Sequence, residues 1–345
     1  MFSNLATLTK IVLAAVISLI VSLVLTPPVR KLAIGIGALD VPDHKRHIHK
    51  KSTPRMGGLA IYLGFVLSLI LFVELTKEVR GILLGSVVIV AMGILDDKYN
   101  LRPLIKLAIQ ILAAGIAILH GVVWDYISSG GGTVSTGLLA YPLTIFWIVA
   151  CTNAVNLIDG LDGLAAGISS ISSLTMLLVA YFLLEPEVAV ILAAVFGACI
   201  GFLPYNMNPA KIFMGDTGSQ FLGYILATAS MLGLFKFYAI FTIFVPLVSL
   251  VYPLMDTGFA FLRRISHGES PFHADRKHLH HRLLDAGFSP KQAVGILCSG
   301  SAFLCLMPII RVSPFMWLKI LCLAGMFATL YIIIMIFISR NGAAK

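Results

Sequence analysis

Long apolar runs recur along the whole chain and limit its fold more than any other feature. About 20 apolar residues in a helix cross a bilayer, and lipid offers no partners for backbone hydrogen bonds, so such runs are expected to be helical. The sequence is 59% hydrophobic and 12% charged, which is more apolar surface than a soluble protein of 345 residues can bury. We therefore predict an all-α, polytopic integral membrane protein.

Eleven runs have the length of a membrane helix, although the third is short. The first run lacks a small-residue cleavage site, so we expect it to be retained. No repeat or low-complexity segment interrupts the chain, and residues 1–345 are predicted to form a single integral membrane domain. The runs cover about 11–29, 57–76, 80–95, 103–120, 138–156, 164–184, 187–204, 218–235, 237–255, 292–310 and 314–338.

The basic residues predict the orientation. Eighteen of the 25 Lys and Arg residues fall on one side of the predicted topology, six fall on the other, and Lys106 lies inside a helix. The positive-inside rule then places the N-terminus outside and the C-terminus in the cytoplasm. Eight of the nine histidines share the basic side, so we expect the active site there. The cytoplasmic loops are about 30–56, 96–103, 157–163, 205–217 and 256–291.

A row of amides and carboxylates interrupts the apolar pattern in the stretch NAVNLIDGLDGL. Asn153, Asn156, Asp159 and Asp162 recur every third residue, and in a helix they would form one polar stripe. Their oxygens are hard ligands of the kind that Mg²⁺ prefers, and Mg²⁺ leaves positions open for water and substrate phosphates. Helix capping and packing are the alternative roles. The membrane setting favours a functional role for the row.

Two further acidic motifs lie on the same side. Asp96 and Asp97 end an apolar run, where adjacent carboxylates repel each other and need a cation to remain ionised. A simple membrane-boundary role is the alternative. Asp216 lies in GDTG, just before another run, where glycines allow a tight turn and a helix start suits phosphate.

The stretch HADRKHLHHRLL carries His278, His280, His281 and Arg282 among further basic residues. Imidazole N–H groups together with Arg and Lys suit a phosphate or diphosphate. A zinc site is disfavoured because the interleaved positive charges repel a metal cation. A solvated basic loop at the membrane surface is the alternative, and it accounts poorly for three clustered histidines.

Carboxylates for a divalent metal and basic clusters for phosphates are the components of phosphoryl transfer. Because the chain lies in a membrane, we expect one reactant to be a lipid phosphate. The other would be a nucleotide-activated donor that arrives from the cytosol.

The sequence resembles the polyprenyl-phosphate N-acetylhexosamine-1-phosphate transferases through five blocks in the family's order. The blocks are KKSTPRMGG, GILDDKYNLRP, NAVNLIDGLDGL, FMGDTGS and HADRKHLHHRLL, which together cover nearly the whole chain. HLHHRLL is similar to the branch that transfers GlcNAc-1-phosphate to undecaprenyl phosphate. The branch that transfers phospho-MurNAc-pentapeptide usually has a different final block and ten helices. Asn100 stands where some members carry a third acid after Asp96 and Asp97.

The resemblance implies a Mg²⁺ site, with Mn²⁺ as a substitute, at Asp216 and Asn156. It further implies that Asp96 and Asp97 lie near the lipid phosphate and that Phe213 stacks on uracil. The implied catalytic residues are Asp96, Asp97, Asp159, His278, His280, His281 and Arg282, of which the His278–Arg282 block grips the diphosphate. The implied substrate-binding residues are Lys51, Arg55, Asp162 and Phe213, with Asp159 and Asp162 near the nucleotide.

The expected partners are UDP-GlcNAc, undecaprenyl phosphate and membrane lipid, without nucleic acid. The expected product, undecaprenyl-diphospho-GlcNAc, would start a cell-envelope glycan such as teichoic acid or O-antigen at the cytoplasmic face of the plasma membrane. The sequence leaves the oligomeric state open, with a homodimer among the possibilities. The alternatives are phospho-MurNAc-pentapeptide transfer and a multipass transporter, which should have midplane polar groups and often an inverted repeat.

Overall fold

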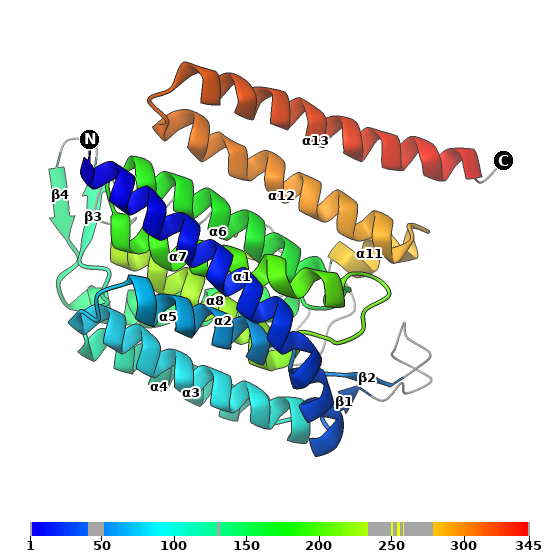
Figure 1. The fold of residues 1–345 in the computed structure, drawn as a ribbon, viewed down its shortest axis with the longest axis horizontal. Helices are drawn as coiled ribbons and strands as arrows, with labels where there is room; N and C mark the ends of the chain where they lie inside the picture. Colours follow the sequence, from blue (N-terminus) through cyan, green and yellow to red (C-terminus); the bar gives the residue numbers. More distant parts are fainter. Residues whose placement is uncertain are drawn as a thin grey trace.

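The computed structural model is a helical bundle (Figure 1). It describes residues 2–40, 52–129, 132–233, 250, 254–255, 258 and 279–343. The helices are α1 (Phe2–Ile36), α2 (Gly58–Phe72), α3 (Lys77–Tyr99), α4 (Pro103–Leu119), α5 (Ala140–Leu157), α6 (Leu164–Phe182), α7 (Pro186–Asn206), α8 (Gly215–Gly233), α11 (Leu279–Asp285), α12 (Pro290–Val312) and α13 (Met316–Ala343).

Two small antiparallel sheets lie at opposite ends of the bundle (Figure 1). At one end β1 (Leu39–Asp40) pairs with β2 (Thr53–Pro54), and Leu39 lies opposite Pro54. At the other end β3 (Tyr126–Ser129) pairs with β4 (Gly132–Ser135), and a 3₁₀ turn at Gly137–Leu139 leads into α5. α1 begins at the end that carries β3 and β4, and α13 finishes at the opposite end (Figure 1).

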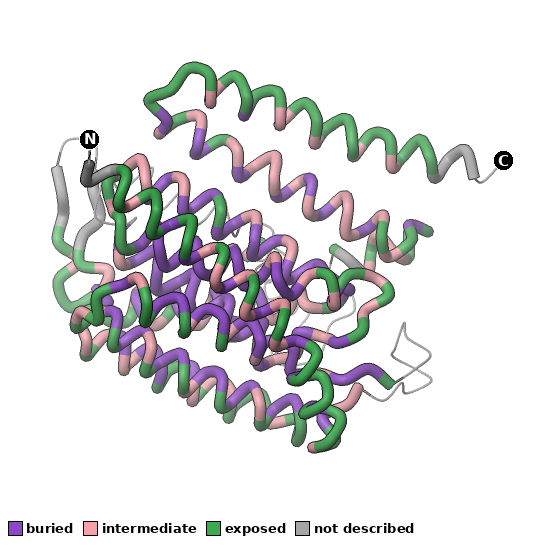
Figure 2. The backbone as a smooth tube through the Cα atoms, in the orientation of Figure 1, coloured by how far each residue is buried: buried purple, intermediate pink, exposed green. Residues whose placement is uncertain are grey.

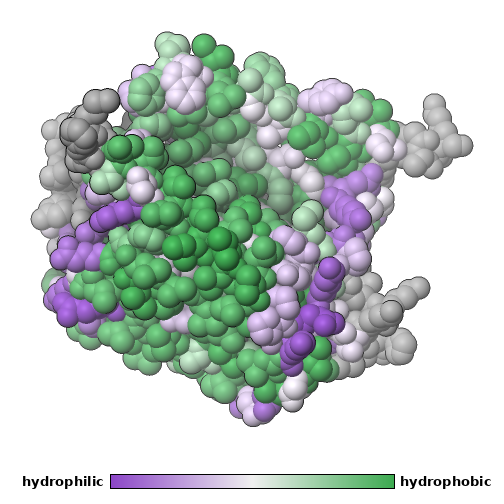
Figure 3. Space-filling model, viewed as in Figure 1, coloured by the Kyte–Doolittle hydropathy of each residue, from purple (hydrophilic) through white to green (hydrophobic). Residues whose placement is uncertain are grey.

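The described helices make the chain a polytopic membrane protein. Seven are long and apolar enough to span a bilayer, and α2 and α4 are shorter apolar helices. The face in Figure 3 has a broad apolar band with hydrophilic residues toward its two ends. Ten of the eleven predicted runs coincide with described helices, whereas the run 237–255 lies almost entirely outside the described residues.

α8 is the central helix of the bundle. Sixteen of its nineteen residues are buried, and Figure 2 shows the same concentration of buried residues in the middle of the fold. Because α8 is surrounded by protein, it tolerates polar residues such as Gln220, Thr228 and Ser230, which find hydrogen-bond partners inside the bundle. The polar residues of the first turn lie at the same end as β1 and β2.

Glycines let neighbouring helices contact the backbone of α8. A Cβ atom on Gly58 of α2 would lie 2.0 Å from Gly218 Cα, and one on Gly93 of α3 would lie 2.4 Å from Thr217 Cα. Real side chains do not approach this closely, so α2 and α3 pack backbone against backbone on the first turn of α8. These contacts fix the position of the turn that carries Asp216.

The first helix is longer than the predicted run 11–29, so Arg30 and Lys31 lie on α1 and not in a loop. The helix continues through Pro27 and Pro28 because its last turns have tertiary partners: Ala33 packs on Met56 in a small buried cluster. Asp96 and Asp97, expected in a loop, lie in the last turns of α3, and Asp216, expected just before a helix, lies in the first turn of α8.

Replacing Gly58 with Ala should destabilise the protein by about 1 to 3 kcal/mol, because the new methyl group would overlap the backbone of α8. Thermal unfolding in detergent would measure the change. Gly115→Ala in α4 is the matched control, since a Cβ atom added there would meet no atom within 4 Å. Equal melting temperatures for the two variants would contradict the packing described above.

Candidate active site

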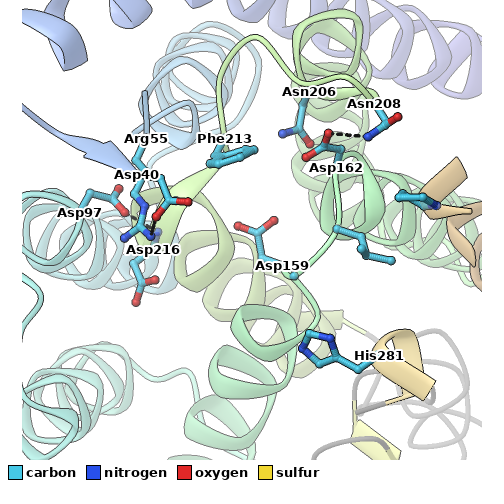
Figure 4. Close-up of a pocket in the computed structure, with 14 residues that line it drawn as sticks. Asp40, Arg55, Asp97, Asp159, Asp162, Asn206, Asn208, Phe213, Asp216 and His281 are labelled. Atoms are coloured by element: carbon cyan, nitrogen blue, oxygen red, sulfur yellow. Dashed lines mark hydrogen bonds and ion pairs between the residues drawn. The ribbon is translucent and has the colours of Figure 1, made fainter. Parts of the chain in front are cut away.

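A cavity of about 270 Å³ opens at the end of the bundle that carries β1, β2 and α11. All five sequence blocks meet there, because Arg55, Asp97, Asp159, Asp216 and His281 each come from a different block. Figure 4 shows Asp159 between two groups of polar side chains. The lining residues are Asp40, Arg55, Asp97, Asp159, Gly160, Leu161, Asp162, Asn206, Asn208, Phe213, Gly215, Asp216, His281 and Pro290.

Backbone hydrogen bonds join the first and fourth blocks. The Phe213 N–H donates to the carbonyl of Pro54 at 2.9 Å, and the Gly57 N–H donates to the carbonyl of Phe213 at 2.9 Å. The Gly58 N–H donates to the carbonyl of Met214 at 2.9 Å. This pairing carries Arg55 and Phe213 to the same side of the cavity although more than 150 residues separate them.

Asp97 caps the N-terminus of α8 from the neighbouring helix α3. One carboxylate oxygen accepts the Asp216 N–H at 2.8 Å, and the other accepts the Thr217 N–H at 3.2 Å and the Thr217 hydroxyl at 2.6 Å. A negative charge at this end also favours the helix dipole. Gly215 has φ +72° and passes so close to Asp97 that any Cβ would lie 2.4 Å from its Oδ2.

Lys106 joins two acids into one charged cluster. Its ammonium group lies 2.9 Å from Asp96 Oδ2 and 2.8 Å from Asp216 Oδ2. Asp96 also accepts the Leu101 N–H at 2.7 Å, and it does not line the cavity. The sequence prediction left Lys106 without a role, although a lone charge inside an apolar helix is a recognisable functional signal.

A chain of three amides, two of them buried, continues from Asp216 into the bundle. Gln220 donates to Asp216 Oδ2 at 2.6 Å, Gln110 donates to Gln220 at 2.9 Å, and Asn153 donates to Gln110 at 2.8 Å. A carboxylate only accepts hydrogen bonds, so it fixes the orientation of Gln220, and each amide then orients the next. Asn153 also donates to the Val149 carbonyl, which fixes the other end of this amide chain.

The amide–carboxylate row is not one helical stripe. α5 ends at Leu157, and the residues before α6 form turns in which Gly163 has φ +80°. The helical part of the row therefore stops after Asn156, which donates to Ser219 at 2.8 Å. The Asp159 N–H donates to the Asn156 carbonyl at 3.2 Å, which closes a turn within the predicted loop 157–163.

Asp162 braces the connection between α7 and α8. Its Oδ2 accepts the Asn208 side-chain amide at 2.9 Å and the Ala210 N–H at 3.0 Å, as Figure 4 shows for Asn208. Asn206 accepts the Gly163 N–H at 3.1 Å and donates to the Ile212 carbonyl at 3.1 Å. Asp162 therefore both lines the cavity and holds its wall.

The cavity is strongly acidic. Five aspartates line it, against one arginine and one histidine among the described residues, and Arg55 is ion-paired with Asp40. Burial, followed by the charges of Asp216 and Asp97, raises the pKa of the Asp159 carboxyl well above its ordinary value, and Arg55 opposes the shift. Such a surface attracts a cation.

The oxygen donors around Asp216 suit a hard divalent cation. The Asn156 amide donates to the Ser219 hydroxyl at 2.8 Å, one helical turn from Asp216, so the two predicted metal ligands belong to contacting parts of α5 and α8, although Asn156 does not line the cavity. Among the described residues, no three His, Cys, Asp or Glu side chains are grouped to hold a metal by themselves. Mg²⁺ fits this set, because it usually takes one or two carboxylates and fills its remaining positions with water and substrate phosphates.

The final sequence block is described in part. His281 lies on α11 and lines the cavity, whereas Arg282 is exposed and does not line it. Lys51 and His278 lie outside the described residues, as does the side chain of His280.

The sequence analysis did not predict six polar residues that line the cavity or contact Asp216 and its neighbours. Asp40, Asn206 and Asn208 line the cavity, and Lys106, Gln110 and Gln220 support Asp216 from behind. Lys106, Gln110 and Gln220 could have been identified from the sequence, because polar residues inside predicted membrane helices often have a function.

The sequence pattern of glycosyl transferase family 4 matches residues 79–234. A Bacillus subtilis protein named "Probable undecaprenyl-phosphate N-acetylglucosaminyl 1-phosphate transferase" is 39% identical, over 90% of this chain and 87% of its own length. The Mycobacterium tuberculosis "Decaprenyl-phosphate N-acetylglucosaminephosphotransferase" is 38% identical over 84% of this chain and 80% of its own. The Salmonella typhi "Undecaprenyl-phosphate alpha-N-acetylglucosaminyl 1-phosphate transferase" is 30% identical over 80% of this chain and 77% of its own.

Asp97→Asn should destabilise the substrate-free protein by about 2 kcal/mol, because Asn has one acceptor oxygen where Asp97 uses two to accept hydrogen bonds from the start of α8. Thermal unfolding at neutral pH would measure this loss. An unchanged melting temperature would show that Asp97 does not support α8.

Asp159→Asn should stabilise the protein at neutral pH, in contrast to Asp97→Asn. An Asp with a raised folded pKa contributes stability below about pH 4, where the unfolded side chain is also protonated, and this stability is lost as the pH rises. The Asn variant should therefore be more stable than the wild type at pH 7, with the difference shrinking toward pH 4. A melting difference that is independent of pH would contradict the raised pKa.

Proposed function

This chain belongs to glycosyl transferase family 4, and on that premise we propose that it transfers GlcNAc-1-phosphate from UDP-GlcNAc to undecaprenyl phosphate. The products are undecaprenyl-diphospho-GlcNAc and UMP, so the chain is a phosphoglycosyltransferase. The relatives whose names describe this transfer align over most of the chain. The observation that carries the proposal is the acidic cavity at one end of a membrane bundle, where all five sequence blocks meet.

We propose that eleven helices cross the plasma membrane, with the N-terminus outside and the cavity at the cytoplasmic face. The distribution of Lys and Arg supports this orientation. α8 ends beside the start of α7, because a Cβ on Gly233 would contact Val188 and Glu185, whereas α11 lies at the cavity end. The end of α8 and the start of α11 therefore lie at opposite ends of the bundle.

The lipid phosphate is the nucleophile in this scheme. One of its oxygens attacks the β-phosphorus of UDP-GlcNAc, the bond from that phosphorus to the bridging oxygen breaks, and UMP leaves with the bridging oxygen. The second pKa of a phosphate monoester is about 6, so the lipid phosphate is largely dianionic at neutral pH. Because Asp97 already accepts three hydrogen bonds from α8, it acts here as a positioning residue and not as a base.

Asp216 and Asn156 would hold a Mg²⁺ ion, for which Mn²⁺ could substitute. When bound, the ion would neutralise the charge of the donor diphosphate in a cavity that otherwise repels it. Lys106 and Gln220 both donate to Oδ2 of Asp216 and so fix the carboxylate against rotation. This arrangement orients the carboxylate before any substrate binds.

The remaining lining residues suit the nucleotide sugar. Phe213 offers an aromatic ring for the uracil, Asp159 and Asp162 offer acceptors for nucleoside hydroxyl and imide groups, and His281 offers an N–H donor for a phosphate oxygen. Arg282 and the neighbouring His278 and His280 of the block, with Lys51, are proposed to supply further positive charge.

The names of the relatives favour GlcNAc over MurNAc-pentapeptide as the transferred sugar. Competition between UDP-GlcNAc and UDP-MurNAc-pentapeptide in one assay would separate these donors. The polar residues of the cavity gather at one end of the bundle, which favours an enzyme at the membrane surface over a transporter with a midplane site.

Purified protein in detergent should release UMP when UDP-GlcNAc, undecaprenyl phosphate and Mg²⁺ are all present, and EDTA should abolish the release. UMP release without the lipid would contradict lipid-phosphate attack, and EDTA-resistant release would contradict the metal site. Because one diphosphate linkage replaces another, labelled UMP and the lipid product should regenerate labelled UDP-GlcNAc. No label in UDP-GlcNAc would contradict the single-displacement scheme.

Gln220→Leu should lower kcat by about 10- to 100-fold, the loss expected when a hydrogen bond to a charged group is removed. The KM for UDP-GlcNAc should change little, because Gln220 lies behind Asp216 and does not line the cavity. Thr228→Val is the matched control in the same helix, since the hydrogen bonds of its hydroxyl among the described residues go to the α8 backbone. Equal kcat values for the two variants would exclude a positioning role for Gln220.

A further inference from the structure

A second cavity, of about 330 Å³, lies on the outer side of the connection between α7 and α8. It is lined by Pro27, Arg30 and Lys31 of α1, Tyr205 of α7 and Lys211 of the connection, and we call it the basic cleft. None of these residues lines the active-site cavity. The reaction proposed above therefore leaves the basic cleft without a role.

Three positive charges surround the basic cleft. The Arg30 Nε donates to the backbone carbonyl of Lys211 at 3.0 Å, and the Lys211 ammonium lies 5.9 Å from the centre of the Tyr205 ring. Within the described part of the chain, no carboxylate is ion-paired with Arg30, Lys31 or Lys211. Like charges held around one cavity raise the local potential and favour an anion.

The basic cleft continues into an apolar stripe on α1. Ile20, Val24, Pro27 and Lys31 are separated by four, three and four residues, so they share one helix face. All four are exposed in the described structure, Ile20 at 50% and Val24 at 61%. An apolar stripe that ends in a basic cleft matches a ligand with acyl chains and an anionic head group.

Close packing of α1 on α7 precedes the basic cleft. A Cβ on Gly197 would lie 2.0 Å from the Ala15 carbonyl oxygen, and one on Gly201 would lie 2.3 Å from the Leu19 carbonyl oxygen. Tyr205 lies one helical turn after Gly201 on α7. Its large side chain prevents the close backbone contact that Gly197 and Gly201 allow. The cleft therefore opens where the glycine contacts between the two helices end.

We propose that the basic cleft binds the phosphate head group of an anionic membrane lipid, whose acyl chains lie along the stripe of α1. Free phosphate is also an anion but has no chains to cover Ile20 and Val24. The proposal does not depend on the transfer reaction, because it rests on charge and exposure outside the active site.

The bound lipid would stabilise the connection between α7 and α8, which forms part of the active-site cavity. The Lys211 N–H donates to the Tyr205 carbonyl at 2.8 Å, and the preceding residue, Ala210, donates its N–H to Asp162. One short segment thus contacts the basic cleft on one side and the active site on the other.

The test is a titration of the full-length protein in detergent with phosphatidylglycerol, followed by native mass spectrometry. Lys31→Gln/Lys211→Gln should weaken retention of the lipid about 30-fold, since each basic group near an anionic lipid adds substantially to binding. Arg30 is kept so that its bond to the Lys211 carbonyl persists. Lys98→Gln/Arg102→Gln is the matched control, because both side chains are exposed at the same end of the bundle but lie outside the basic cleft.

Selective loss of phosphatidylglycerol in the cleft variant, with equal melting temperatures for both variants, would support the proposal. Equal retention by the cleft variant and the control would overturn it. A second arm adds inorganic phosphate to the wild type: displacement of the lipid by millimolar phosphate would identify a free-anion site and overturn the lipid assignment. A third arm replaces phosphatidylglycerol with phosphatidylcholine, and equal retention of this zwitterionic lipid would also overturn it.

Discussion

The hydrogen bonds between Asp97 and the start of α8 are the interaction on which the rest of the site depends. They join a carboxylate at the end of one helix to the unpaired N–H groups of another, at an end of the bundle where unpartnered charge is costly. Asp216, the proposed metal ligand, is the next residue after Gly215 and takes its position from this cap. The glycines of α2 and α3 then hold the same turn by direct backbone contact.

Charge balance around Asp216 explains why so many polar residues lie behind the cavity. Lys106 neutralises part of the charge of Asp96 and Asp216, and the amides of Gln220 and Gln110 extend the hydrogen bonding into the protein interior. A buried network of this kind is stable only when each member has a partner. The cavity itself keeps an excess of carboxylates, which would attract the proposed divalent cation, and that cation would in turn attract the proposed anionic donor.

The sequence predicted the membrane class and the places of ten helices, although α1 extends beyond its predicted run at both ends, because apolar length is a strong and local signal. It also predicted seven of the fourteen residues that line the cavity: Arg55, Asp97, Asp159, Asp162, Phe213, Asp216 and His281. It did not predict that Asp97 caps α8, because that contact joins residues about 120 positions apart. Lys106, Gln110 and Gln220 were missed for a related reason: Lys106 and Gln110 lie in one apolar run and Gln220 in another, and their contacts exist only in three dimensions. The end of α5 was predicted to within one residue, at 156 against Leu157, but the row was also considered as one helical stripe, because a three-residue spacing fits both a helix and a series of turns.

The pairing of Lys106 with two acids has a consequence for biosynthesis. Asp96 and Lys106 are ten residues apart on the neighbouring helices α3 and α4, so they can enter the bilayer as a neutralised pair while the chain is still being made. Asp216 emerges from the ribosome much later and meets a lysine that is already in place. Because Asp96 is translated before Lys106, the lysine has a partner in the membrane before α8 is made.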